Sequence, residues 1–338
     1  MMKRVYGVLS LLILLGLTAF AAAETLTISL IGDCAVGGID TNNYITSSFT
    51  RLIDKLGFGK EYPFLHFAQL LNEDDLTIAN CEVCYTLRKP ASKDKLNLRA
   101  APEWAEAFKL GGVDAVNTAN NHTMDYGRAG YQDTMEALRT QGIGAFGNGE
   151  LYITQVKGVT IGMTGYTYPH RNDITRQTKD IHELRARGCD LVIVSMHWGR
   201  EENATPTREQ RLLGPKLIEA GADIVFGHGP HVLHPIEIYQ GKVIFYSLAN
   251  LVFGAHSNPK DPDTAVAQLV YSINGELRLN EVRVIPARMH ENKNFQPFPY
   301  TREEDKQRVY RKMVFKNRDE SGLPEDFIFT GSAVFNNP

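Results

Sequence analysis

The stretch Ala119-Asn120-Asn121-His122-Thr123-Met124-Asp125-Tyr126-Gly127 decides how this chain is interpreted. It follows the run from Val113 to Val116, which predicts a strand. Two amides, an imidazole and a carboxylate stand within residues 120–125, at the point where that strand ends. This is the composition of a binding or catalytic site, so the strand end is expected to carry function.

Four other short apolar runs end in the same kind of polar group. The residues that follow them are Asp33, Glu82, His197 and the pair His228 and His231. In α/β sheets, ligands bind beyond the carboxyl ends of the strands, where loops converge over a rigid sheet. We therefore expect the five strand ends to meet in one metal site.

The order of the predicted elements indicates an α/β fold. Strands are predicted over residues 25–31, 75–79, 113–116, 191–196 and 224–226, and helices over 63–71, 102–110, 131–140, 182–187 and 207–220. Strand pairs are predicted over 152–164, 236–247 and 266–285, with turns at Gly158, Gln240-Gly241 and Asn274-Gly275. A pair of sheets flanked by helices is the simplest architecture for this order.

The two ends of the chain differ from this domain in composition. Residues 1–23 join a basic start, an apolar run and Ala21-Ala22-Ala23, which together predict a secretory signal peptide. An uncleaved N-terminal anchor is the alternative, although the apolar run is shorter than the roughly 20 residues of a membrane span. Residues 24–290 are expected to form the domain. Residues 291–338, charged and proline-containing, are expected to pack on it or trail from it.

The charge of the chain limits its partners. With 36 Lys and Arg against 39 Asp and Glu, the net charge is −3, and removal of Lys3 and Arg4 with the signal gives 34 minus 39, or −5. No basic block stands out, so neither nucleic acid nor an anionic lipid surface is expected as the main partner. An acidic polymer would need a local positive centre, such as a bound metal ion.

Four cysteines leave two alternatives open. Cys81 and Cys84 form the one close pair, and in an exported protein a local disulfide could join them. Free thiols are the alternative. Cys34 and Cys189 are expected to be small buried hydrophobic residues.

Each of the polar strand-end residues also has an ordinary explanation when taken alone. An Asp at a strand end commonly serves as a turn or cap residue, Asn supplies turn geometry, and a single imidazole is more often structural. The coincidence at five strand ends favours the metal site. Carboxylate and imidazole ligands suit Mn, Zn or Fe, and six of them suffice for one or two divalent transition-metal ions.

Six motifs occur in order between about residues 25 and 285. They are Gly32-Asp33, Asn80-Cys81-Glu82, Ala119-Asn120-Asn121-His122 with Asp125-Tyr126-Gly127, His197-Trp198-Gly199, Gly227-His228-Gly229-Pro230-His231 and Tyr246-Ser247-Leu248-Ala249-Asn250. Together they resemble the CapA family of poly-γ-glutamate capsule biosynthesis proteins, which is similar in fold to the calcineurin-like metallophosphoesterases. The resemblance implies a four-layer α/β/β/α sandwich of the metallo-dependent phosphatase type, with the site at one edge of the paired sheets.

Carried onto this chain, the resemblance implies a site for two metal ions. The implied metal ligands are Asp33, Glu82, Asn121, His197, His228 and His231. In this assignment Glu82 is the bridging carboxylate, and Asp33 and His231 hold the first metal. The other three residues hold the second metal.

The resemblance also implies two roles beside the metals. His122 would be the acid or electrostatic group beside the leaving oxygen, and Asp125 would orient its imidazole. The chain departs from the metallophosphoesterase pattern in two places. Those proteins usually carry a His where this chain has Ala35, and they usually bridge the metals with Asp where it has Glu82. The first metal would thus have fewer protein ligands.

The function that these features predict is an exported, metal-dependent hydrolase or transferase. Its substrate would be an anionic envelope polymer such as poly-γ-glutamate, attacked by metal-activated water. Two alternatives remain open: a non-catalytic accessory or polymer-binding subunit of a capsule synthase, and an exported phosphodiesterase or nucleotidase. Membrane-embedded synthase subunits are the expected protein partners. The expected location is secreted, periplasmic or at the cell surface.

Overall fold

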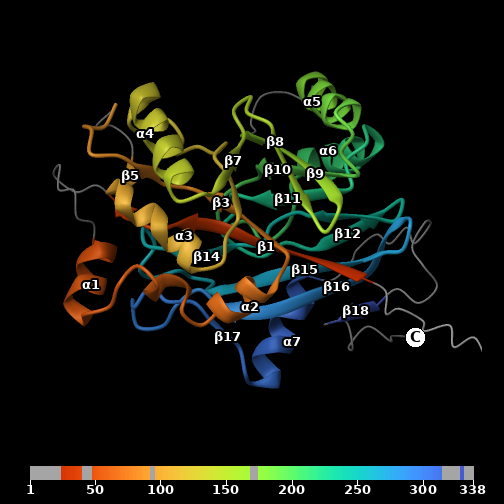
Figure 1. Cartoon of the computed structure of the whole chain (residues 1–338). Helices are drawn as coiled ribbons and strands as arrows, with labels where there is room; N and C mark the ends of the chain where they lie inside the picture. The colour runs from red at the N-terminus through yellow and green to blue at the C-terminus, as the bar shows by residue number, and fades with distance from the viewer. Residues whose placement is uncertain (1–23, 40–47, 92–95, 168–173, 314–327, 331–338) are drawn as a thin grey trace, which may run out of the picture.

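Two β-sheets packed face to face form the centre of the molecule in the computed structural model (Figure 1). The structure describes residues 24–39, 48–91, 96–167, 174–313 and 328–330. The larger sheet has the spatial order β17 (Phe298–Pro299), β16 (Leu277–Arg288), β15 (Asp263–Ile273), β1 (Glu24–Ala35), β3 (Leu76–Cys81), β6 (Ala115–Asn117) and β7 (Gly144–Phe146). Two more strands join it, because β14 (Asn250–Phe253) pairs with β1 and β18 (Ile328–Thr330) pairs with β16.

The smaller sheet supplies the second layer of strands. Its spatial order is β12 (Ile236–Tyr239), β13 (Lys242–Phe245), β11 (Ile224–His228), β10 (Leu191–His197), β9 (Val159–Thr167) and β8 (Tyr152–Val156). A third, small sheet joins β2 (Gly38–Ile39), β5 (Leu98–Ala100) and β4 (Cys84–Tyr85).

Strand β1 shows why the two large sheets share a core. Leu26, Ile28 and Leu30 alternate along the strand, so their side chains leave the same face, and all three are fully buried. They belong to one apolar cluster with residues of the smaller sheet, including Ile193 and Phe226. Each side chain of this size contributes roughly 1.5–3 kcal/mol when it is fully buried. A continuous apolar layer therefore holds the sheets together.

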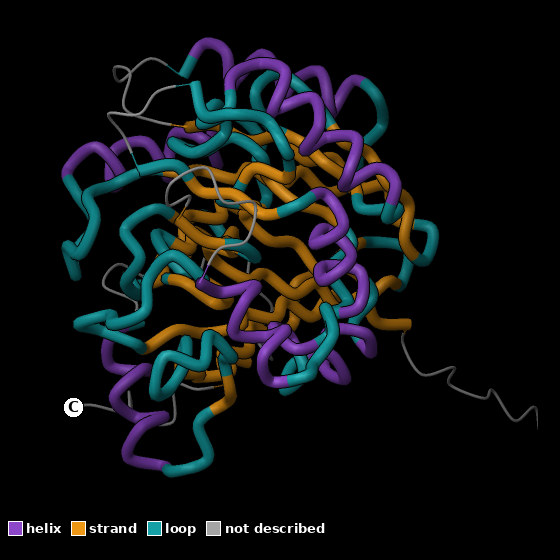
Figure 2. Tube along the Cα trace, turned by 90° about the vertical axis from the view of Figure 1, so that its left-hand side faces the viewer, coloured by secondary structure: helices purple, strands orange, loops and turns teal. Residues whose placement is uncertain are grey.

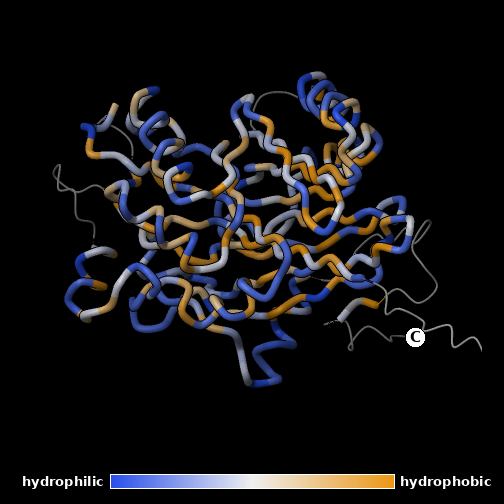
Figure 3. Tube along the Cα trace, in the orientation of Figure 1, coloured by the Kyte–Doolittle hydropathy of each residue, from blue (hydrophilic) through white to orange (hydrophobic). Residues whose placement is uncertain are grey.

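Helices cover both outer faces of the sheet pair. The outer face of the larger sheet packs on α1 (Ser48–Leu56), α2 (Ala68–Glu73), α3 (Glu106–Leu110) and α4 (Gly127–Thr140), and that of the smaller sheet on α5 (Thr175–Ala186) and α6 (Arg208–Glu219). Figure 2 shows the strands enclosed by helices, and Figure 3 shows the hydrophobic segments concentrated in the sheets. The predicted four-layer α/β/β/α sandwich is confirmed.

Strand direction brings several carboxyl ends to one edge. Strands β1, β3 and β6 run parallel, with Asp33 opposite Asn80 in the register of β1 and β3. Strands β10 and β11 also run parallel, with His197 opposite His228 at their ends. Two predicted ligands, His197 and His228, therefore stand in register in the smaller sheet, and Asp33 lies near the end of β1 in the larger one.

Some elements differ from those expected from the sequence. The strands of the small sheet have two or three residues each, which is too few to show a hydrophobic period. The helix predicted over 102–110 is divided into a 3-10 helix (Pro102–Ala105) and α3. Residues beyond 290 form β17 and a further helix, α7 (Glu303–Lys312).

The predicted signal peptide, residues 1–23, lies outside the described residues, as do 314–327 and 331–338 of the predicted extension. Within the part of the chain that the structure describes, no helix is long and apolar enough to cross a membrane.

Helix α7 closes one end of the core between the two sheets. It carries buried Val309, and Met313 directly follows the helix; both belong to the inter-sheet apolar cluster. The backbone oxygen of Met313 also accepts a hydrogen bond from the backbone nitrogen of Ile236, at the start of β12. This part of the C-terminal segment is therefore integral to the domain.

A buried carboxylate fixes α7 to β15. Asp263 is 2% exposed and accepts hydrogen bonds from Arg308 (2.9 Å), Lys312 (2.7 Å) and the hydroxyl of Tyr300 (2.7 Å). Burial alone would raise the pKa of Asp263, but these three hydrogen bonds lower it to about 2. The ionised form of Asp263 therefore holds the helix.

Replacing Asp263 by Asn is expected to lower the free energy of unfolding by roughly 1–3 kcal/mol, because buried hydrogen bonds to a charged group are lost. The folded-state pKa of Asp263 lies below its ordinary value, so its stabilisation is present above about pH 4 and is lost as the pH falls towards about 2. Urea unfolding at neutral pH, with thermal melts at falling pH, measures both effects.

The matched control is Asp261→Asn. Asp261 also accepts a hydrogen bond from Lys312, but its side chain is 28% exposed. An equal loss of stability in the two variants would contradict the role assigned to Asp263.

Candidate metal centre

The structure brings together five of the six predicted metal ligands. Asp33 lies near the end of β1, Glu82 follows β3, His197 and His228 end β10 and β11, and His231 lies in the next loop. Their ligand atoms form two groups, and within each group all atoms lie within 4.8 Å of one another. One group is Asp33, His197 and His228, and the other is Asp33, Glu82 and His231.

The distances show how the two groups share carboxylates. Oδ1 of Asp33 lies 3.5 Å from Nδ1 of His228 and 3.8 Å from Nδ1 of His197, while its Oδ2 lies 3.2 Å from Nδ1 of His231. Oε1 of Glu82 lies 3.9 Å from Nε2 of His197 and 4.0 Å from Nε2 of His231. Asp33 thus belongs to both groups, and Glu82 spans two histidines. The bridging role of Glu82 stays a prediction.

A close backbone approach positions Asp33. Its backbone nitrogen donates to the carbonyl oxygen of Ala249 at 2.9 Å. A Cβ on the preceding residue, Gly32, would lie 1.9 Å from that oxygen, so only glycine fits there. From the other sheet, the backbone nitrogen of Gly229 donates to Oδ2 of Asp33 at 2.9 Å. Asp33 is therefore held by both halves of the sandwich.

Glu82 is the clearest sign that the cluster is suited to hold a cation. Its side chain is fully buried, and neither carboxylate oxygen has a hydrogen-bond partner among the residues that the structure describes. Burial and the negative charge of Asp33 raise the pKa of Glu82 well above its ordinary value. A buried carboxylate without hydrogen bonds is costly, and a bound cation would compensate it. Two carboxylates and three imidazoles fit a divalent transition-metal ion by donor type.

Some members of the cluster already favour the protonation state that suits metal binding. Burial lowers the pKa of His197 well below its ordinary value and that of His228 to about 4. Burial also acts to lower the pKa of His231, but the hydrogen bond and charge of Asp33 outweigh it and raise that pKa. Burial would raise the pKa of Asp33, yet its hydrogen bond to His231 and the charges of all three histidines lower it. Neutral imidazoles and an ionised carboxylate are the forms that ligate metals, so His197, His228 and Asp33 favour the ligating form, whereas His231 must lose a proton first.

Further polar contacts orient the histidine rings. Oγ of Ser195 lies 2.7 Å from Nε2 of His228, and Oδ1 of Asn250 lies 2.7 Å from Nδ1 of His231. Nδ1 of His197 lies 3.0 Å from Nδ1 of His228. His231 has a φ of 59°, a left-handed conformation that costs energy in a residue other than glycine. The surrounding structure therefore fixes the rings before a ligand arrives.

His122 and Asp125 form a pair beside the cluster. Nδ1 of His122 lies 2.7 Å from Oδ2 of Asp125, which also accepts a hydrogen bond from the backbone nitrogen of Leu98 at 2.7 Å. The side chain of Asp125 is fully buried, whereas the side chain of His122 is 11% exposed. A positive charge on His122 acts to lower the pKa of His197, so the ring lies within electrostatic reach of the cluster. The contact that orients His122 is present, and its catalytic role stays a prediction.

Asn121 is the predicted ligand with an exposed side chain. It lies on the loop between β6 and α4, and its role as a ligand stays a prediction. The neighbouring Asn120 is buried, and its Nδ2 donates to the carbonyl oxygen of Cys81 at 2.8 Å.

Three buried asparagines near the ligands, Asn80, Asn117 and Asn120, were given no role in the site from the sequence, although Asn80 and Asn120 stand in two of the quoted motifs. Nδ2 of Asn80 donates to Oδ1 of Asp33 at 2.7 Å, and Oδ1 of Asn80 accepts from Asn117 (2.8 Å) and Asn120 (3.2 Å). Oδ1 of Asn120 accepts from the backbone nitrogen of His122 at 3.1 Å. These amides join Asp33 to the loop of His122. The available signal was position, because Asn80 and Asn117 stand at strand ends as the ligands do.

Ala35 offers no metal ligand, as the sequence indicated. It is fully buried in the apolar cluster on the outer face of the larger sheet. The histidine that metallophosphoesterases usually carry there has no substitute at this position.

The cysteines are free thiols in the structure. Of the two alternatives for Cys81 and Cys84, the disulfide is therefore not formed, and Sγ of Cys84 donates to the carbonyl oxygen of His122 at 3.2 Å. Burial raises the pKa of Cys84 to about 12, so its thiol stays protonated. Cys34 and Cys189 are buried, as expected.

Comparisons with known proteins agree with these motifs. The chain matches the family described as bacterial capsule synthesis protein PGA_cap over residues 27–255. It is 29% identical over 319 residues to the capsule biosynthesis protein CapA of Bacillus anthracis, covering 86% of this chain and 73% of that protein. It is also 29% identical over 328 residues to the PGA biosynthesis protein CapA of Bacillus subtilis (strain 168), covering 90% of this chain and 81% of that one.

A solved structure, the NAD nucleotidase of Haemophilus influenzae, matches with a TM-score of 0.41 and 14% identity, over 89% of this chain and 58% of that one. The family match spans every strand end that carries a predicted metal ligand. This chain belongs to the CapA-like family of bacterial capsule synthesis proteins.

Proposed function

We propose that this protein is an exported, metal-dependent hydrolase or transferase that acts on poly-γ-glutamate or a related anionic envelope polymer. The observation that carries the proposal is the buried carboxylate of Glu82, which has no described hydrogen-bond partner and lies in a cluster with Asp33 and three histidines. The polymer class comes from the relatives, whose names refer to capsule and PGA biosynthesis. Export comes from the signal peptide predicted in residues 1–23.

The cluster is suited to hold one or two Mn, Zn or Fe ions. Bound ions would supply a water nucleophile at neutral pH and stabilise the negative charge that develops on the attacked group. Asp33, Glu82 and the histidines would hold the ions, while Asn80 fixes the carboxylate of Asp33 through a 2.7 Å hydrogen bond. The protein's contribution is thus a rigid, largely dry set of ligands.

His122 is proposed to donate a proton to the leaving nitrogen of a cleaved γ-amide. Its Nδ1 faces Asp125, so Nε2 is the atom available to the substrate. His122, His197 and His231 have side chains 11%, 8% and 15% exposed, whereas Asp33, Glu82 and His228 have none of theirs exposed. A polymer would therefore reach the site from the side of these three rings.

A second function, that of an accessory subunit of a membrane-embedded capsule synthase, is favoured by one observation. Ala35 leaves the cluster with fewer ligands than a metallophosphoesterase has, and its burial leaves no room for a replacement. In that case the cluster would bind the polymer or support the fold without turnover.

Elemental analysis of the purified protein is expected to find one or two equivalents of transition metal. Asp33→Ala and His231→Ala should lose most of it, because each removes a ligand. Asn80→Ala keeps every ligand but releases the carboxylate of Asp33, so metal affinity should fall by roughly 10–100-fold. The control is His182→Ala, which changes an exposed histidine on α5 and should keep full metal content. Unchanged metal content in both ligand variants would contradict the assigned centre.

Size-exclusion chromatography is expected to show chelator-sensitive shortening of poly-γ-glutamate by the protein. His122→Ala should lower kcat by roughly 10²–10⁴-fold with metal content unchanged, because proton transfer to the leaving group is lost. His182→Ala should have no effect. A fully active His122→Ala variant would contradict the proposed acid, and metal-loaded protein that never shortens the polymer would favour the accessory function.

Metal affinity is expected to rise with pH. The pKa of Glu82 is raised well above its ordinary value, and that of His231 is also raised, so metal binding must displace protons from these groups. The pKa of His228, at about 4, leaves that ligand neutral already at neutral pH. Calorimetry in two buffers of different ionisation enthalpy should detect proton release on metal binding, and Glu82→Gln should reduce it. Affinity that falls with rising pH would contradict these protonation states.

A further inference from the structure

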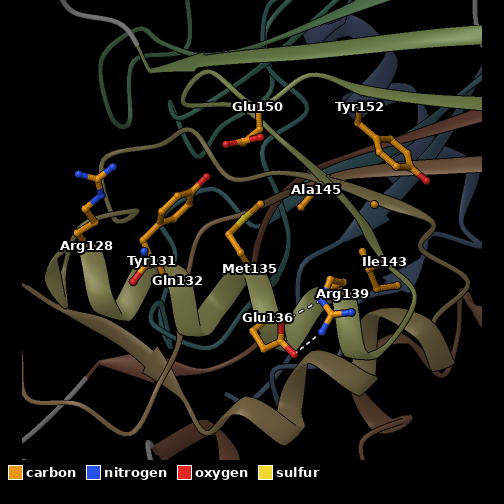
Figure 4. Close-up of a pocket in the computed structure, with 11 residues that line it drawn as sticks. Arg128, Tyr131, Gln132, Met135, Glu136, Arg139, Ile143, Ala145, Glu150 and Tyr152 are labelled. Atoms are coloured by element: carbon orange, nitrogen blue, oxygen red, sulfur yellow. Dashed lines mark hydrogen bonds and ion pairs between the residues drawn. The ribbon is translucent and has the colours of Figure 1, made fainter.

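One hollow in the molecule is lined by none of the residues of the proposed metal centre. It is a pocket of about 530 Å³ between α4 and the edge strands β7 and β8 (Figure 4). This volume is typical of small-molecule sites. Tyr131 and Met135 line it from α4, and Ile143, Ala145 and Tyr152 line it from the strand side, so much of the wall is apolar.

Two side chains of opposite charge line this pocket without a partner. Arg128, in the first turn of α4, and Glu150, in the loop before β8, form no salt bridge or side-chain hydrogen bond with any residue that the structure describes. Arg139 of the same pocket differs, because its Nε and Nη2 donate to the carboxylate of Glu136 at 2.9 and 2.5 Å (Figure 4). Arg128 and Glu150 are therefore the charges left for a ligand.

The pocket adjoins the loop that carries His122. The hydroxyl of Tyr131 lies 3.5 Å from Oγ1 of Thr118, and Nδ2 of Asn148 donates to the carbonyl oxygen of Thr118 at 3.1 Å. That same carbonyl accepts a hydrogen bond from Oγ1 of Thr123, the residue after His122. Thr118 thus connects the wall of the pocket to the loop of the proposed acid.

A cation and an anion in one pocket suit a ligand that carries both charges. In a γ-linked glutamate chain, each amide bond uses the side-chain carboxyl group. The amino-terminal residue therefore keeps a free ammonium and a free carboxylate on the same carbon. Interior residues keep the α-carboxylate alone, and the carboxyl-terminal residue has two carboxylates, so the amino end is chemically distinct.

We propose that this pocket binds the amino-terminal residue of a γ-linked glutamate chain. Its α-carboxylate would pair with Arg128, which can make two parallel hydrogen bonds, and its α-ammonium would pair with Glu150. Tyr131 and Met135 would contact its two methylene groups. The assignment rests on the proposed polymer substrate, and it means that the protein engages chain ends rather than random interior positions.

Calorimetry with the dipeptide γ-glutamyl-glutamate tests this pocket on the protein as purified. Every variant used keeps the ligands of the metal centre, so any binding of the probe's carboxylates there is the same in all of them. Arg128→Gln and Glu150→Gln should each weaken dipeptide binding about tenfold. Arg139→Gln, in the same pocket, should leave it unchanged. The N-acetylated dipeptide lacks the ammonium, so it should bind the unmodified protein about tenfold more weakly and should be insensitive to Glu150→Gln.

Equal binding of the two dipeptides, or an equal loss in Arg139→Gln and Arg128→Gln, would overturn the pocket assignment. The proposed hydrolase activity is tested separately, by measuring chelator-sensitive shortening of the polymer. A protein that shortens the polymer but binds both dipeptides equally would overturn the pocket alone. A protein that binds the dipeptide through Arg128 and Glu150 but never shortens the polymer would support the pocket and overturn the hydrolase.

Discussion

The burial of two carboxylates in one cluster is the constraint on which this edge of the molecule depends. Asp33 is compensated by the backbone of Gly229, by Asn80 and by the histidines. Glu82 accepts no hydrogen bond from any described residue, and the rings of His197 and His231 lie 3.9 and 4.0 Å from its Oε1. Each sheet contributes ligands, so the free energy of cation binding would stabilise the packing of one sheet on the other. Metal binding and the packing of the two sheets are therefore linked in one equilibrium.

Much of the fold and five of the candidate ligands could be predicted from the sequence, for a physical reason. Long strands such as β1 and β10 have a clear apolar pattern, and their ends mark where side chains converge. The contribution of Asn80 could not be predicted, because it depends on the register between β1 and β3, which brings Asn80 opposite Asp33. An asparagine at a strand end is equally typical of an ordinary turn. Helix α7 was missed because its sequence is strongly charged and its one buried residue, Val309, leaves no apolar stripe to detect.

One loop connects the two sites of the molecule. On one side, Asn117 and Asn120 donate to the amide that holds Asp33. On the other side, Thr118 contacts the wall of the pocket that contains Arg128. A shift of this loop would therefore change both the orientation of a metal ligand and the shape of the pocket. The loop of residues 118–126 therefore contacts both sites, and it carries many polar groups.

The placement of β1 in the larger sheet has a consequence for how the cluster would acquire an ion. β1 lies between β3 and β15, and Asp33 stands opposite Asn250, which is 217 residues later (250 minus 33). Contacts between such distant segments form late, because a long loop must close first. Asp33 cannot take its final position until most of the chain is present. Any ion that the cluster binds would therefore be chosen from the metals of the compartment where folding finishes. For the exported protein proposed above, that is not the compartment where the chain is synthesised.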